Sequence, residues 1–139
     1  MRLILRSLSI LLFLLASQQA LAGKGDRVPS HESVSAALAD ILNSSERQPL
    51  PIERIKAALK AHYLDNGGSI YWVGTGRMTP FIQRLEDAQF DGLNPDDYPV
   101  DTLIDVRDSV DPDDPRSAAQ AELYYSAFFV VYAADLKIG

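Results

Sequence analysis

The sequence predicts a small, mostly α-helical bundle with one short β-like segment, preceded by a signal peptide. The chain has 139 residues, enough for one domain. Apolar residues make up 47% and charged residues 23% of the chain, as in ordinary globular proteins. After residue 30, apolar residues recur mostly every three or four positions, which is the period of a helix that buries one face.

The first 22 residues have the pattern of a secretory signal peptide. Arg2 and Arg6 precede an apolar run over 8–16, and Ala20-Leu21-Ala22 supplies small residues for cleavage. The run is shorter than the ~20 residues of a membrane-spanning helix. We therefore expect an exported chain that begins at Gly23, without a membrane span after cleavage; an uncleaved membrane anchor is the alternative.

Charge and the lack of cysteine exclude several classes of function. The chain carries 13 basic and 19 acidic residues, and without the two leader arginines the balance is 11 minus 19, or −8. Such a negative domain is a poor binder of nucleic acid or of anionic membrane surfaces, so we expect no nucleic-acid partner. The absence of cysteine excludes disulfides, thiol nucleophiles and thiolate metal ligands.

Caps and helix breakers mark the predicted helices. Ser30 is the expected N-cap of a helix over 31–43. A second helix is expected from Pro51 to the stop signal Asn66-Gly67-Gly68. Thr79-Pro80 predicts the start of a third helix, with Thr79 as its N-cap and the proline in its first position.

Two further helices complete the predicted bundle. A short helix is expected over 99–110, followed by an acidic, proline-broken linker. The longest helix is expected over 117–137. Because it is apolar nearly all round, we expect it to lie in the middle of the bundle or to pack on two partners.

A short aromatic segment is the main candidate contact site. Ile70-Tyr71-Trp72-Val73 is typical of a β-strand but is too short to form a sheet by itself. The glycines that follow, in Gly74-Thr75-Gly76, indicate a turn, because a third glycine and a P-loop lysine are missing. We expect Tyr71 and Trp72 to pack inward; exposed, they would stack on sugar rings or contact a partner.

The loop Asp91-Gly92-Leu93-Asn94-Pro95-Asp96-Asp97-Tyr98 is expected to reverse the chain between two helices. Gly92 allows a positive φ after a helix end, and Asn94 before proline is pushed out of the helical region. Asp96 and Asp97 are expected to cap the next turn. The predicted structural residues are Gly92, Leu93, Asn94, Pro95, Asp97 and Tyr98.

No pattern marks a catalytic, cofactor-binding or metal site. His31 and His62 are the only histidines, and they lack partners at ligand spacing, so we expect them on the surface. The aspartates of the 91–98 loop do not match a calcium-binding loop. Paired carboxylates that cleave glycans stay open as a hypothesis, although no position marks such a pair. We predict no cofactor.

Four stretches taken together resemble the N-terminal scaffold domain of the large multidomain L,D-transpeptidases of Gram-negative bacteria. They are Ala61-His62-Tyr63 with Asn66-Gly67 and Tyr71-Trp72-Val73; the helix over 81–88; the 91–98 loop; and Tyr132-Ala133-Ala134-Asp135-Leu136-Lys137-Ile138-Gly139. The resemblance covers residues 48–139. It divides the chain into a signal peptide (1–22), a lead-in with the first helix (23–47) and a truncated scaffold-like domain (48–139).

The resemblance implies a periplasmic enzyme that cross-links peptidoglycan with a cysteine nucleophile in a separate catalytic domain. Since this chain lacks cysteine, we assign it no catalytic residue and expect it to be inactive alone. We expect the non-catalytic N-terminal part of such an enzyme. Its expected partners are the catalytic domain, in cis if the protein is longer and otherwise in trans, and peptidoglycan. The alternative is a stand-alone periplasmic adaptor for peptidoglycan or a cell-wall enzyme.

Overall fold

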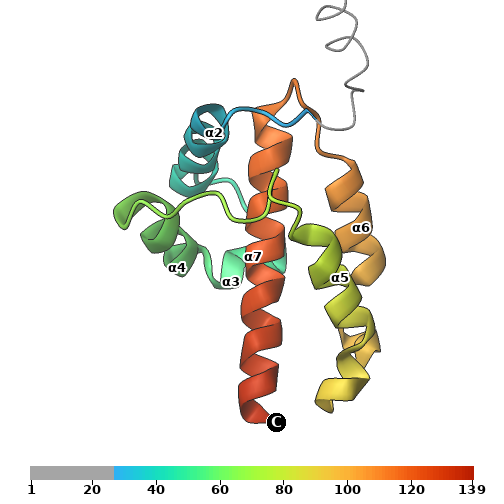
Figure 1. Cartoon of the computed structure of the whole chain (residues 1–139). Helices are drawn as coiled ribbons and strands as arrows, with labels where there is room; N and C mark the ends of the chain where they lie inside the picture. The colour runs from blue at the N-terminus through green and yellow to red at the C-terminus, as the bar shows by residue number, and fades with distance from the viewer. Residues whose placement is uncertain (1–26) are drawn as a thin grey trace, which may run out of the picture.

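The computed structural model describes residues 27–139, so the predicted signal peptide and the start of the lead-in lie outside the described residues. The long helix α7 (Pro115–Ile138) runs through the centre, with α2 and α4 on one side, α5 and α6 on the other, and α3 behind it (Figure 1). The other elements are α2 (His31–Asn43), α3 (Leu50–Arg54), α4 (Lys56–Lys60), the π-helical turn η2 (Ala61–Asp65), α5 (Met78–Glu86), the 3₁₀ turns η3 (Ala88–Asp91) and η4 (Pro95–Asp97), and α6 (Val100–Asp108).

The predicted fold class, a small and mostly α-helical domain, is confirmed. Within residues 27–139 there is no β-strand, and the predicted β-like segment at Ile70–Val73 is irregular: the backbone bends at Trp72 and enters a turn at Val73. The reason is that its backbone finds another partner. The N–H groups of residues 71–73 bond to a side chain of α7 instead of to a neighbouring strand.

Helix α2 forms as predicted. The backbone N–H of Ser33 donates to Oγ of Ser30 at 3.2 Å, which satisfies one of the free donors of the first turn. Val34, Leu38 and Ile41 are buried at helical spacing. They form the apolar face with which α2 packs on α7.

The predicted second helix is divided into three pieces. At Ile55 the backbone leaves the helical region (φ −118°, ψ 17°), and its N–H bonds to the carbonyl of Ile52, a tighter three-residue turn. The chain then runs through α4 into η2. It stops at the predicted place, because Asn66 donates to the carbonyl of Ala61 and Gly67 has φ 62°.

The predicted start of the third helix was wrong. Helix α5 begins at Met78, and Thr79 does not cap it. Instead, Oγ1 of Thr79 accepts a hydrogen bond from Arg107 Nη1 at 3.0 Å. Pro80 is the third helical residue rather than the first. It still lies in the first turn, where the missing N–H has no partner within the helix.

The 91–98 loop has the predicted positive φ at Gly92, 79°. Its predicted caps were wrong, because Asn94 rather than an aspartate caps η4: Asn94 Oδ1 accepts from the N–H of Asp96 at 3.2 Å. The asparagine side chain accepts from the backbone N–H two residues ahead, as in an Asx turn. Asp96 is exposed.

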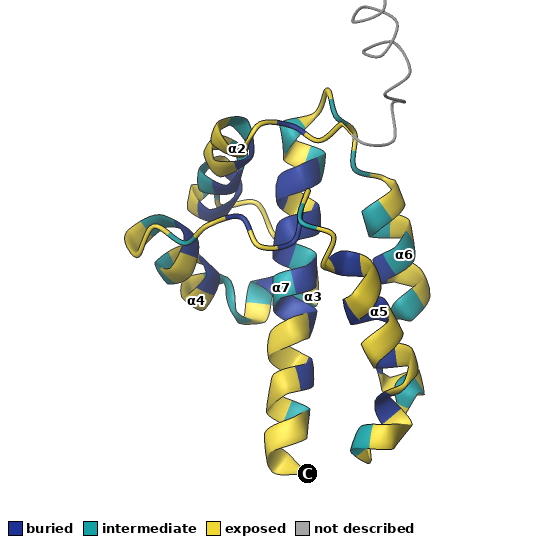
Figure 2. Ribbon diagram, viewed as in Figure 1, coloured by how far each residue is buried: buried dark blue, intermediate teal, exposed yellow. Residues whose placement is uncertain are grey.

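The two halves of α7 differ in burial. Asp114 caps its start, and Ala118, Ala119 and Ala121 are fully buried, where small side chains let other helices approach closely. From Phe129 onward most residues are exposed, and Figure 2 shows this half of the helix largely in the colour of exposed residues. In the part of the chain that the structure describes, no helix is long and apolar enough to cross a membrane.

Candidate docking surface

A buried carboxylate on α7 holds residues 71–73 in place. Glu122 is fully buried, and its Oε1 accepts from the N–H of Tyr71 at 2.7 Å and from the hydroxyl of Tyr63 at 2.7 Å. Its Oε2 accepts from the N–H groups of Trp72 at 2.9 Å and Val73 at 3.0 Å. Burying a carboxylate is costly unless it is hydrogen-bonded, and these four donors satisfy it. Glu122 therefore holds three successive backbone N–H groups of a bent segment, which an adjacent strand could not do.

One turn further along α7, Ser126 extends this network. Trp72 Nε1 donates to Ser126 Oγ at 3.0 Å, and Ser126 Oγ lies 2.7 Å from the hydroxyl of Tyr63. An indole N–H only donates and an ionised carboxylate only accepts, so the direction is determined: Ser126 donates to Tyr63, and Tyr63 donates to Glu122. Burial, reinforced by the negative charge of Glu122, raises the pKa of Tyr63 well above its ordinary value.

Next to this network lies an apolar groove of about 600 Å³. Its walls come from α4 with η2, from the irregular segment 69–72 and from α7. The groove has a volume typical of ligand pockets. The residues that line it are Ile55, Ala58, Leu59, His62, Tyr63, Ser69, Tyr71, Trp72, Ser126, Phe129 and Val130.

The two predicted contact residues have different environments, although both line the groove. Trp72 is only 4% exposed and packs against Phe81 and Tyr125, with ring centroids 5.1 and 5.6 Å away. Tyr71 is 46% exposed. The guanidinium of Arg77 lies 4.3 Å from the centre of its ring, and Arg77 Nη1 also donates to the Tyr71 carbonyl. The expected inward packing is thus confirmed for Trp72 and wrong for Tyr71, whose side chain reaches the surface.

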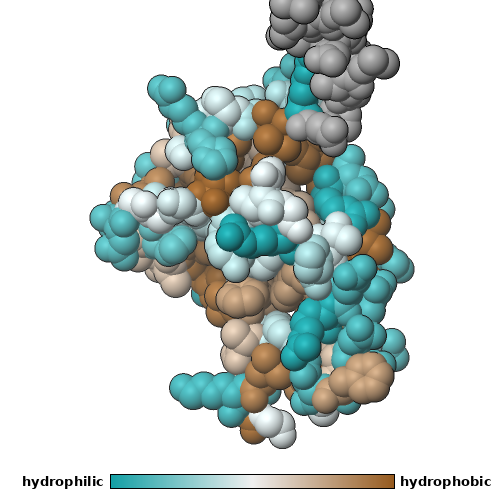
Figure 3. Space-filling model, viewed as in Figure 1, coloured by the Kyte–Doolittle hydropathy of each residue, from teal (hydrophilic) through white to brown (hydrophobic). Residues whose placement is uncertain are grey.

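The groove continues into an exposed apolar surface on residues 129–138 of α7, called here the open stretch. Its exposed large apolar side chains are Phe129, Val130, Val131, Leu136 and Ile138. Figure 3 shows apolar side chains gathered over this lower part of α7. Glu122, Ser126, Phe129, Ala133 and Leu136 follow at spacings of three and four, so they share one face of the helix. That face is covered at Glu122 and Ser126 and uncovered after them.

Another face of the open stretch is fixed by the 91–98 loop and α5. The hydroxyl of Tyr132 donates to Asp91 and accepts from Arg84 Nε at 2.9 Å, while Arg84 Nη2 pairs with Asp91 at 2.8 Å. The hydroxyl of Tyr98 donates to Asp135 at 2.8 Å. Burial, followed by the carboxylate bonds, raises the pKa of Tyr98 and of Tyr132.

The predicted structural residues of the loop occupy separate positions. Leu93 is half-buried and packs against the core, and Tyr98 is buried. Gly92, Asn94 and Asp97 are exposed, and Pro95 is half-buried. The contacts that join the loop to α7 therefore come from its two ends.

Sequence reasoning missed Glu122, Ser126, Arg84 and Tyr132. Glu122 offered one signal, because it is a charged residue within an otherwise apolar stretch of the longest helix. Both histidines are exposed, as predicted, and only His62 borders the groove. Among residues 27–139, no group of three or more histidine, cysteine or acidic side chains is placed to hold a metal ion.

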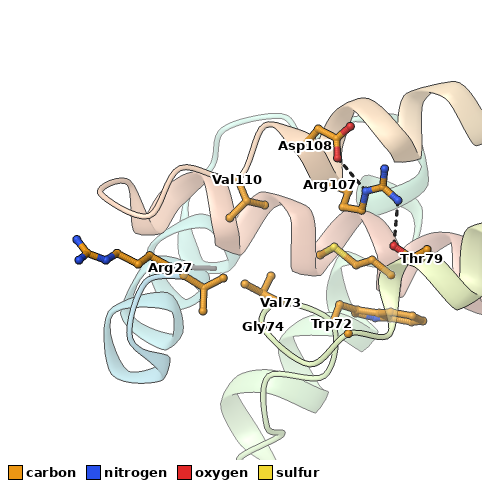
Figure 4. A pocket seen from close by; sticks show the side chains of 11 residues that line it. Arg27, Trp72, Val73, Gly74, Thr79, Arg107, Asp108 and Val110 are labelled. Atoms are coloured by element: carbon orange, nitrogen blue, oxygen red, sulfur yellow. Dashed lines mark hydrogen bonds and ion pairs between the residues drawn. The ribbon is translucent and has the colours of Figure 1, made fainter. Parts of the chain in front are cut away.

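A second cavity, of about 610 Å³, lies between the 73–76 turn and the facing ends of α5 and α6 (Figure 4). Arg107 borders it but already bonds to Asp108 at 2.9 Å and to Thr79 at 3.0 Å. Figure 4 shows the guanidinium of Arg27 pointing away from Arg107. The two arginines therefore do not converge on a common ligand position.

Comparison with known protein families identifies the family of this chain. The family described as "Scaffold domain" matches residues 57–139, more than half of the chain. The matched region contains every groove residue except Ile55, together with the whole open stretch. No curated protein and no solved structure matches the chain. The chain belongs to the Scaffold domain family.

Proposed function

We propose that this chain is the non-catalytic scaffold part of a longer periplasmic L,D-transpeptidase that acts in peptidoglycan cross-linking and cell-wall biogenesis. Its role is to pack against the catalytic domain and to hold it in position. Membership of the Scaffold domain family supports the scaffold role. The resemblance of the 91–98 loop and of the segment 132–139 supports the link to these enzymes.

The observation that carries the proposal is the open stretch of α7. Contiguous exposed apolar patches are uncommon on soluble monomers and mark surfaces that another molecule or domain covers. Covering one large apolar side chain is worth about 1.5–3 kcal/mol, and Phe129 and Leu136, which share one face of α7, together with the neighbouring Val130 provide a substantial drive for association. The 91–98 loop holds another face of the same helix, which keeps this surface in a defined position.

The catalytic step itself is assigned to the other domain. Acyl transfer in these enzymes uses a cysteine nucleophile, and this sequence contains no cysteine. Periplasmic location is proposed from the leader pattern over 1–22. The purified chain is therefore expected to form no peptide cross-links.

The test is the intact mass of the native protein in the periplasmic fraction of the cells that make it. The proposal expects a species much larger than residues 23–139 that contains peptides of this chain and a cysteine-bearing domain. A species that runs only from Gly23 to Gly139 would contradict the proposal. Recovery of the protein only from the cytosol would contradict the proposed periplasmic location.

A second candidate function, a stand-alone adaptor that binds peptidoglycan, is favoured by one observation. The half-exposed ring of Tyr71, held by Arg77, offers an aromatic surface at the edge of the groove. If the chain is such an adaptor, it should bind saturably to purified sacculi, and the variant Tyr71→Ala should lose this binding. Retention of binding in that variant would exclude Tyr71 as the contact.

A further inference from the structure

We propose that the groove and the open stretch of α7 together bind one amphipathic α-helix that carries acidic residues beside its apolar stripe. This inference rests on the proposed function, because the helix is assigned to the remaining part of the same transpeptidase. It adds the kind of element that covers the surface and the chemistry that the element must have.

The shape of the surface fits a helix. The face of α7 that carries Glu122 and Ser126 is covered by Tyr63 and residues 71–73, and the same face is uncovered over 129–138. This stretch is about 15 Å long at 1.5 Å per residue, or nearly three helical turns. Ala133 lies in its middle, and a small residue there allows a second helix to approach within the usual 8–10 Å between helix axes.

The chemistry of the groove favours an apolar side chain over a sugar. The polar groups on its inner side, the hydroxyls of Tyr63 and Ser126 and the indole N–H of Trp72, are bonded to one another and to Glu122. The other polar side chains that line it, His62, Ser69 and Tyr71, lie at its exposed edge. A sugar needs hydrogen-bonding partners for its own hydroxyls, and the groups on the inner side are already engaged. A large apolar side chain of the docked helix needs none, and the groove is large enough to take it.

The positive charges around the surface favour a docked helix that carries acidic residues. Residues 54–62 contain the exposed Arg54 and Lys60 and no acidic residue, although acidic residues outnumber basic ones in the whole chain. Lys56 is already bonded to the carbonyl of Ser44 at 2.9 Å, and the exposed Asp65 follows at the end of η2. Arg54 and Lys60 adjoin the groove residues Ile55 and Leu59 in sequence. At the other end of the open stretch Lys137 is exposed, whereas Asp135 is bonded to Tyr98. Acidic residues at the flanks of the docked helix would meet these cations.

The same charges disfavour a second copy of this chain as the occupant. If two open stretches paired in antiparallel fashion, Lys137 of each copy would approach the groove of the other copy and its basic segment at 54–62. If they paired in parallel fashion, the two Lys137 side chains would face each other. Like charges in contact suppress an association in either arrangement.

Site-specific photo-cross-linking in the native, full-length protein tests the inference. A photoreactive amino acid replaces Val130, which is exposed and therefore replaceable without loss of the fold. Irradiation of cells is expected to yield an intramolecular cross-link to a segment outside residues 1–139, with apolar residues at helical spacing and Asp or Glu beside them. The matched control places the same residue at Gln120, which is exposed in the first half of α7 and borders residues of α3 and α6 instead of the groove, and is expected to leave that segment unlabelled.

Four outcomes would overturn the inference: a cross-link to residues 27–139 of a second copy, a glycan adduct, a cross-link to a segment without helical spacing or acidic residues, or no cross-link. Each of these, found in a protein long enough to contain a catalytic domain, leaves the proposed function intact. A native protein that ends at Gly139 would instead contradict the proposed function. The two failures are therefore distinguishable.

Charge reversal at Lys137 tests separately whether the docked helix carries acidic residues. Lys137→Glu is expected to lower the cross-link yield from position 130, whereas Lys137→Gln should lower it less. Added salt should reduce the difference between the variants, because exposed charges are screened over about 10 Å at 0.1 M. Equal yields from all three proteins at low salt would show that the docked helix is not recognised by its charge.

Discussion

Glu122 accepts the backbone N–H of Trp72 at 2.9 Å across 50 positions of sequence. This contact joins the only tryptophan of the chain to the central helix. It also fixes the irregular segment that forms one wall of the groove. A single carboxylate thus connects the stability of the fold with the shape of the candidate docking surface.

Glu122→Gln is expected to lower the free energy of unfolding by about 2–4 kcal/mol, because the amide nitrogen cannot accept from the buried N–H groups that one carboxylate oxygen now serves. Urea denaturation followed by Trp72 fluorescence measures the change. The control Glu86→Gln alters an exposed glutamate and should stay within about 0.5 kcal/mol of the parent protein. Equal stability of the two variants would contradict the role given to Glu122.

Tyr63 and Ser126 are expected to act as a coupled pair. Tyr63→Phe removes a donor to Glu122 and should cost about 1–2 kcal/mol. Ser126→Ala breaks the link between Tyr63 and Trp72. In a double-mutant cycle the two losses should differ from their sum by at least about 0.5 kcal/mol, since both residues belong to one network. Additive losses would show that the relay does not couple them.

Alkaline pH is expected to destabilise the protein. Burial raises the pKa of Tyr125 to about 12, and the pKa values of Tyr63, Tyr98 and Tyr132 are raised as well. Above about pH 10 the unfolded chain releases these protons while the folded chain retains them, so the free energy of unfolding falls as pH rises. The contribution is fully present below pH 10.

Thermal unfolding between pH 8 and pH 11.5, combined with tyrosinate absorbance, measures this effect. Buried tyrosines should ionise together with unfolding rather than before it. The variant Tyr125→Phe should show a shallower loss of melting temperature above pH 10. A melting temperature that stays constant over this range would contradict the raised pKa values.

Gly92→Val is expected to cost about 1 kcal/mol or more, because a branched residue is strained at φ 79°. No heavy atom lies within 4 Å of the added Cβ position, so the cost comes from the backbone alone. Gly92→Asn is the matched control, since asparagine tolerates the left-handed region better. Melting temperatures should therefore fall in the order parent, Asn, Val, and an unchanged Val variant would contradict this backbone assignment.

Tyr98→Phe combined with Asp91→Asn is expected to loosen the second half of α7 without unfolding the domain. These changes remove the bond to Asp135 and weaken the contact with Tyr132. Hydrogen exchange should become faster for amides after Phe129, while those near Leu123 keep their protection, because core packing holds the first half. Equal acceleration along the whole helix would show that the loop does not act on the second half alone.

Much of the local structure could be predicted because its causes are local. Ser30 caps α2 through its own side chain, and Gly67 and Gly92 adopt positive φ because they lack a Cβ atom. The start of α5 could not be predicted, because Thr79 bonds to Arg107, 28 positions away, rather than to its own helix. The prediction that Asp96 and Asp97 cap the turn was wrong for a local reason, because Asn94 Oδ1 accepts from the backbone N–H of Asp96.

The sequence by itself determined the helical class, most helix ends and the loop that reverses the chain, since spacing, caps and glycines act within a few residues. Only the tertiary structure decided what the segment at residues 70–73 binds, which of Tyr71 and Trp72 is buried, and which half of α7 is left open. Those outcomes depend on contacts between distant residues, above all the four bonds to Glu122. A burial pattern that changes halfway along one apolar helix becomes visible only when its neighbours are in place.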